Sequence, residues 1–82
     1  MPGYRVDTGC VSEGRDRLAA ARIRAAAAKA RELDTHRRAI ELHERSALYQ
    51  DGLGHHAAAE LERERAEMVR ERLAQAIREG DG

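Results

Sequence analysis

Two long stretches of the chain carry apolar residues at intervals of three, four and seven, the spacing of an amphipathic helix. From Ser12, a residue type suited to a helix N-cap, to about Gln50 there is no proline, and Gly14 is the only glycine. We therefore predict one helix over residues 12–50. At a rise of about 1.5 Å per residue it would be roughly 58 Å long, far beyond an ordinary globular helix.

The segment DGLG, residues 51–54, is the one internal turn signal, because its two glycines can end a helix and let the chain reverse. The helical pattern resumes over residues 55–79 and closes with Arg78, as the helix dipole favours. Residues 1–11 contain the only proline and no sustained period, so we predict an irregular N-terminal arm. The predicted fold class is all-α, a long antiparallel helical hairpin whose first helix extends roughly three turns beyond the second.

The apolar residues on each helix cover a wider arc than the stripe of a little over about 100° that one neighbouring helix requires. The core is also thin, because the chain has no Phe or Trp and 16 of its 34 hydrophobic residues are alanines. Both observations predict that two hairpins pair, in the manner of a coiled coil, into a homodimeric four-helix bundle. The predicted interface residues are Leu33, Ile40, Leu42, Tyr49, Leu61, Met68, Val69, Leu73 and Ile77.

Polar residues accompany the apolar seam on both helices. His36 and His43 lie seven residues apart beside the best apolar positions of the first helix. If the hairpin folds about Leu53, His43 comes opposite Glu62, which lies within the apolar stripe of the second helix. A buried polar group is tolerated when it is hydrogen-bonded, so we predict that these two side chains are partners. In the first interpretation such groups are structural and set the register of the helices, with no cofactor.

A metal or haem site is an alternative interpretation of the same residues. Inward-facing histidines and glutamates bind iron in ferritin-like and hemerythrin-like bundles. However, neither helix contains the Glu-x-x-His spacing of the di-iron proteins, and Glu32 with His36 is one residue too long. The candidate ligands are His36, His43, Glu62 and His55.

Charge is balanced overall, with 15 basic and 15 acidic residues, but it is divided along the chain. Residues 15–38 contain eight basic and three acidic side chains, whereas residues 41–82 contain six basic and ten acidic ones. The second alternative is therefore nucleic-acid binding through the overhanging start of the first helix, by Arg15, Arg17, Arg22 and Arg24. Basic positions along an alanine-rich helix are more often a solvated face or the partner of an acidic helix, which argues against nucleic acid.

Catalytic chemistry has no support in the sequence. It shows no glycine-rich phosphate loop, no nucleophile in a recognisable setting and no acid–base pair, so we expect no enzymatic activity. No apolar run approaches the roughly 18 residues of a membrane span. The single cysteine, Cys10, fits a reducing compartment, and 14 arginines to 1 lysine are typical of high-GC bacterial sequence. We predict a small cytoplasmic, non-catalytic, self-associating module for protein–protein interaction or regulation, whose further protein partner is unknown.

Overall fold

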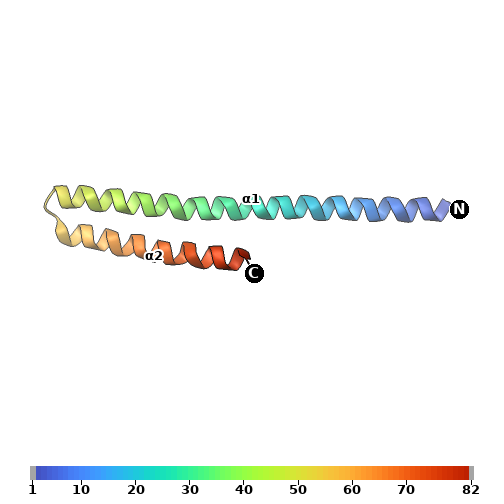
Figure 1. The fold of residues 1–82 in the computed structure, drawn as a ribbon. Helices are drawn as coiled ribbons and strands as arrows, with labels where there is room; N and C mark the ends of the chain where they lie inside the picture. Colours follow the sequence, from blue (N-terminus) through green and yellow to red (C-terminus); the bar gives the residue numbers. More distant parts are fainter. Residues whose placement is uncertain (1, 82) are drawn as a thin grey trace.

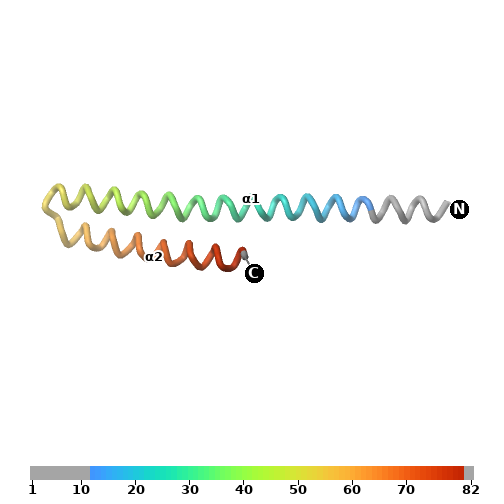
Figure 2. Tube along the Cα trace, in the orientation of Figure 1, coloured from blue at the N-terminus to red at the C-terminus, as the bar shows by residue number. Residues whose placement is uncertain are grey.

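The computed structural model consists of two helices joined by a tight turn (Figure 1). α1 spans Pro2–Gly52 and α2 spans His56–Asp81. The structure describes the side chains of residues 12–80. These residues make up most of the coloured part of the tube in Figure 2. α1 begins at Pro2, whereas the sequence predicted an irregular arm over residues 1–11; the side chains of residues 1–11 lie outside the described range. The described part of the chain contains helices and no strands, so the predicted all-α hairpin is confirmed.

The two helices form a single layer. α2 runs antiparallel beside the C-terminal half of α1 (Figure 1). The principal extents of the chain are 81 × 20 × 10 Å, and the smallest of them is the thickness of a single helix. A Cβ built on Gly80 would come within 3.2 Å of the Lys29 side chain, which marks how far α2 reaches along α1. Residues 12–28 therefore extend beyond α2, about one turn more than the roughly three turns predicted from the helix lengths, and we call this segment the overhang.

A glycine in the left-handed conformation ends α1. Gly54 has φ of +78°, so the predicted role of this turn is confirmed at its second glycine. The His55 N–H donates to the Gln50 carbonyl at 2.8 Å, and the Gly54 N–H donates to the Asp51 carbonyl at 3.0 Å. These are the two bonds of a Schellman motif, which satisfies carbonyls left free at the helix end. In place of the usual apolar contact, the side chains of His55 and Gln50 share a 3.0 Å hydrogen bond.

The core between the helices is made of alanine. Ala47, Ala59, Ala66 and Ala76 are at most 4% exposed and are the buried apolar residues of the described chain. The larger residues of the seam are only half-buried, and these are Leu33, Ile40, Val69 and Leu73. Alanines at the centre of a helix pair let the two backbones approach closely, but they contribute little hydrophobic free energy. The hairpin is thus closely packed and weakly supported.

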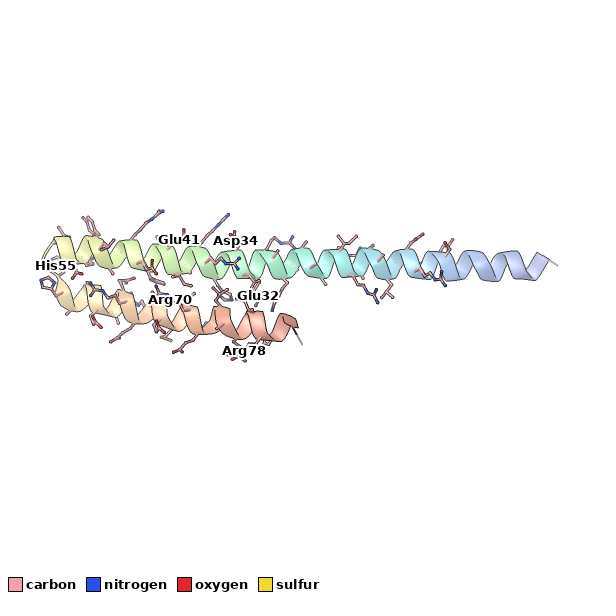
Figure 3. All side chains as sticks on the ribbon, viewed as in Figure 1. Glu32, Asp34, Glu41, His55, Arg70 and Arg78 are labelled. Carbon is pink, nitrogen blue, oxygen red and sulfur yellow. The ribbon has the colours of Figure 1, made fainter. Side chains whose placement is uncertain are left out.

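Ion pairs close one flank of the seam. Asp51 pairs with Arg63, and Glu44 pairs with Arg70. The two acids lie seven residues apart on α1 and the two arginines seven apart on α2, so both pairs stand on the same side of the layer. Figure 3 shows Arg70 between the two helices. We call this side the ion-pair flank.

Candidate functional site

A histidine–carboxylate pair lies inside the seam. The His43 Nδ1–H donates to Glu62 Oε2 at 2.7 Å, which confirms the partnership predicted from the sequence. The side chain of Glu62 is 15% exposed and that of His43 is 27% exposed, so both are largely withdrawn from water. Arg65 Nη1 also donates to Glu62, at 2.5 Å. Both oxygens of this carboxylate therefore have partners.

The pair changes the titration of Glu62. The hydrogen bond from His43 is the main cause that holds the pKa of Glu62 below its ordinary value of 4.5. Arg65 acts in the same direction, while partial burial opposes both. The pKa of Asp51, at the turn, is likewise lowered, chiefly by its hydrogen bond with His56 and also by Arg63. Both carboxylates favour the folded hairpin in their ionised form.

We expect acid to destabilise the hairpin through Glu62. Its pKa is lower in the folded than in the unfolded state, so below the unfolded value the unfolded chain binds more protons. Ionised Glu62 therefore adds to the free energy of unfolding at any pH above its pKa in the unfolded chain. This contribution is lost as the pH falls through the lower pKa of Glu62 in the folded chain. Urea unfolding at stepped pH from about 6 to 3 should show a shallower decline in Glu62→Gln than in the native chain. Equal declines in the two proteins would contradict this prediction. Glu41→Gln, at an exposed position, serves as the control.

The four candidate metal ligands are not gathered at one place. His43 and Glu62 are in contact, His36 lies 3.9 Å from Glu32, and His55 lies at the turn (Figure 3). Within the described residues, no group of three or more His, Cys, Asp or Glu side chains is placed to hold a metal ion. What the structure does bring together is the hydrogen-bonded pair proposed in the structural interpretation.

The nine predicted interface residues divide into two sets. Four of them, Leu33, Ile40, Val69 and Leu73, are half-buried in the seam between α1 and α2 of the same chain. The other five face solvent, and their exposed fractions are 65% for Leu42, 66% for Tyr49, 47% for Leu61, 52% for Met68 and 40% for Ile77. The single hairpin leaves this second set without a partner.

Four of the exposed residues share one side of the layer. Leu42 and Tyr49 each stand two residues before the acids of the ion-pair flank, and Leu61 and Met68 each stand two before its arginines. At about 100° per residue, each apolar row is rotated about 200° from the ion pairs of its own helix. Both rows therefore lie away from the ion-pair flank. Each row is also rotated about 140–160° from the buried alanines of its own helix, so the two rows stand near the outer edges of the layer. We call these four residues the open face.

Ile77 does not belong to the open face, and it does not lie in the seam either. Its neighbour Ala76 is the residue that is buried in the seam. Ala76 is 4% exposed, whereas Ile77 is 40% exposed and stands seven residues after Arg70, on the ion-pair flank. The sequence signal for Ala76 is its heptad relation to Val69, a position seven residues earlier in the same seam. The sequence analysis selected Ile77 because it is the larger apolar residue of the two.

The candidate nucleic-acid residues all lie on the overhang. Arg15, Arg17, Arg22 and Arg24 are exposed and precede the part of α1 that α2 covers. None of the four makes an ion pair or a side-chain hydrogen bond with another residue in the range 12–80. The overhang also exposes Leu18 and Ile23, at 53% and 69%.

Comparisons with known proteins return no relative. No protein-family model, curated protein or solved structure matches this chain.

In the described residues, neither helix has an apolar stretch long enough to cross a membrane. A hollow on α2 is lined by Met68, Glu71, Arg72 and Gln75, all on one helix, so it is a depression between neighbouring side chains.

Proposed function

We propose that this chain is a non-catalytic, self-associating helical hairpin that forms a homodimeric four-helix bundle. It serves as a cytoplasmic module for protein–protein interaction or regulation. The open face is the observation that supports this most directly. Leu42, Tyr49, Leu61 and Met68 are exposed apolar residues on the side of the layer away from the ion pairs, and the layer's own core is alanine. A second layer against that side would give both hairpins the core that each lacks.

The expected energies suit a reversible dimer. Full burial of a large apolar side chain is worth about 1.5–3 kcal/mol, so covering a half-exposed one contributes about 1 kcal/mol. Two open faces bring eight such side chains together, for a total on the order of 8 kcal/mol. This is comparable with the roughly 4–15 kcal/mol that association costs in lost freedom. Contacts beyond the open face are therefore needed for a tight dimer.

Sedimentation equilibrium at micromolar concentration tests this proposal. We expect a dimer mass for the native chain and a thermal midpoint that rises with protein concentration, because an obligate dimer is stabilised by mass action. The substitutions Leu42→Glu and Met68→Glu, made together, should raise the dimer dissociation constant by at least about a hundredfold, since each places charges in the new core.

The matched control is Leu48→Glu. Leu48 is 72% exposed on the same helix, but it is rotated about 100° from Tyr49 and away from the open face. It should leave the dimer mass unchanged. A native chain that remains a helical monomer across this concentration range would overturn the four-helix proposal.

A further inference from the structure

A row of arginines borders the open face along α1. Arg38 and Arg45 stand four residues before Leu42 and Tyr49, so at about 100° per residue each is rotated about 40° from its apolar neighbour, toward the outer edge of the layer. Both arginines are exposed. Arg38 contacts an aspartate of its own helix at 2.9 Å, and Arg45 makes no ion pair with another residue in the range 12–80.

The acids of this part of α1 lie on the far side of the arginines. Asp34 and Glu41 are rotated by a further 40° and 60°, approximately, from Arg38 toward the ion-pair flank. They therefore do not border the open face, and the charge next to its α1 row is positive.

Carboxylates take the corresponding place on α2. Glu64 stands four residues before Met68 and Glu71 stands three residues after it, so they are rotated about 40° and 60° from this residue, again toward the outer edge. Both are exposed, and neither makes an ion pair with a residue in the range 12–80. The charge at the outer side of the α2 row is negative.

The inner side of each row, nearer the seam, differs between the helices. On α1 it holds Ala39 and Ser46, which are small and uncharged, and on α2 it holds Arg65 and Arg72. Arg65 Nη1 donates to Glu62 of its own helix at 2.5 Å. Opposite charges therefore occur only at the outer sides of the two rows.

A two-fold axis can stack two open faces in two ways, because it lies between the layers and runs either perpendicular or parallel to the helices. A perpendicular axis packs α1 on α1 of the second copy, which sets arginines against arginines and glutamates against glutamates at the outer edges. A parallel axis packs α1 on α2 of the second copy, so that each row of arginines meets a row of glutamates. Like charges across a contact are destabilising, which favours the parallel axis.

Heights along the helices agree with the parallel axis. Rotation about it leaves every residue at its height, so residues that meet across the dimer are level within one hairpin. The numbers of residues in contact across the seam add up to between 105, for His43 and Glu62, and 114, for Asp51 and Arg63. The open-face and charged pairs whose numbers add up to 109 or 110 are Tyr49 with Leu61, Leu42 with Met68, Arg45 with Glu64, and Arg38 with Glu71.

Rotation about the helix axes also suits a second neighbour for each helix. The seam side of α1 is centred between Ala47 and His43, and a helix resting between Ser46 and Leu42 would lie about 100° round from that centre. The α2 residues at the same intervals are Ala66, Glu62, Arg65 and Leu61. Two neighbours at about a right angle are the arrangement of a four-helix bundle.

We infer that the two-fold axis of the dimer runs parallel to the helices, so that α1 of each copy packs on α2 of the other. The inference rests on the proposed dimer and specifies which surfaces it joins. Each of the two contacts covers one apolar row from either copy. At its outer side Arg38 and Arg45 meet Glu71 and Glu64, and at its inner side the arginines of α2 face small uncharged residues of α1.

Charge reversal tests the inference on the full-length chain. The first variant carries Arg38→Glu and Arg45→Glu, and the second carries Glu64→Lys and Glu71→Lys. Each variant alone sets like charges against each other in both contacts, so its dimer dissociation constant should rise at least about tenfold at low salt. Circular dichroism should show that helicity is retained, because all four side chains are exposed.

Mixing the two variants should restore the dimer. In the mixed dimer, one contact has reversed charges and the other has native charges, so both are complementary. We expect a dissociation constant within about threefold of that of the native chain.

The matched control carries Arg22→Glu and Arg37→Glu, the same change of charge at exposed positions rotated at least about 140° from Leu42. Alone, it should stay within about threefold of the native dissociation constant. Mixed with the second variant, it has the same net charges as the restoring mixture but keeps like charges in one contact. This mixture should therefore dimerise more weakly than the restoring one.

Spin labels test the direction of the axis without changing the open face. Nitroxide labels are attached to Ala19→Cys in a chain that also carries Cys10→Ser, and their separation is measured by pulsed electron resonance. A parallel axis brings both overhangs to one end of the bundle, with labels within about 35 Å, because diagonal helices are about 14 Å apart. A perpendicular axis places them at opposite ends, roughly 65 Å apart, since residues 29–52 of α1 span about 36 Å.

The other outcomes separate the inference from the proposal on which it rests. A native dimer with labels roughly 65 Å apart, or a mixture that binds more tightly than the native chain while neither variant alone is weakened, would show that α1 packs on α1. The parallel axis would then be overturned and self-association would stand. A native chain that is monomeric at micromolar concentration would overturn both.

Discussion

Leu73→Glu is expected to unfold the hairpin. Leu73 is one of four large apolar residues in a seam whose buried positions are otherwise alanine. Replacing it removes apolar contact worth about 2 kcal/mol and places a carboxylate among apolar side chains. A chain of 82 residues buries a small fraction of its surface and has little stability to lose. Circular dichroism should report a large loss of helical signal at 25 °C.

The control for this experiment has the same chemistry at another position. Leu48→Glu changes an apolar residue that is 72% exposed, so we expect the free energy of unfolding to stay within about 0.5 kcal/mol of the native value. Leu33→Glu, on the facing helix, should behave like the Leu73 variant. If Leu73→Glu kept native helicity and cooperative unfolding, the seam would not be the main source of stability.

The hairpin and its polar pair could be predicted because both depend on spacing alone. A long run without proline, two glycines and a resumed period define two antiparallel helices. Folding such a pair about the turn fixes which residues lie at the same height, and this placed His43 opposite Glu62. Height along a helix is set by the rise per residue, which hardly varies between sequences.

The surfaces were harder to predict because they depend on the rotation of each helix about its axis. The sequence shows a broad apolar arc on α1 and does not say which part of it α2 covers. The structure covers the part with Leu33 and Ile40 and leaves Leu42 exposed. The same rotation buries Ala76 in preference to Ile77. Alanine adds little hydrophobic free energy, so a pattern of large residues gives little weight to the positions where the backbones meet.

Ion pairs between the helices could not be predicted for the same reason. Asp51 and Arg63, or Glu44 and Arg70, are ordinary charged residues until the rotation brings them to one flank. Their shared interval of seven residues is visible in the sequence, but many other charged residues show it too. Once the flank is known, the side with unpartnered apolar residues follows directly, and with it the candidate surface for a second copy.

The second large effect is expected at the pair of His43 and Glu62, where single and double substitutions should give opposite results. His43→Leu leaves the 15%-exposed carboxylate of Glu62 with only Arg65 as partner, and Glu62→Leu leaves His43 without its acceptor. Each single change should lower the midpoint of urea unfolding, because a largely buried polar group without its partner is destabilising.

The double substitution, His43→Leu with Glu62→Leu, should restore the midpoint of urea unfolding to the native value or exceed it. Apolar residues that replace a complete polar pair add hydrophobic contact to a core that otherwise depends on alanine. The four chains form a double-mutant cycle, whose interaction energy isolates the pair. If the pair bound a metal, the double substitution would instead lower the midpoint of urea unfolding below that of the native chain. Removing both ligands would also remove the folding free energy linked to the metal. Stoichiometric metal in protein purified without added metal, lost on His43→Leu, would therefore contradict the structural role of this pair.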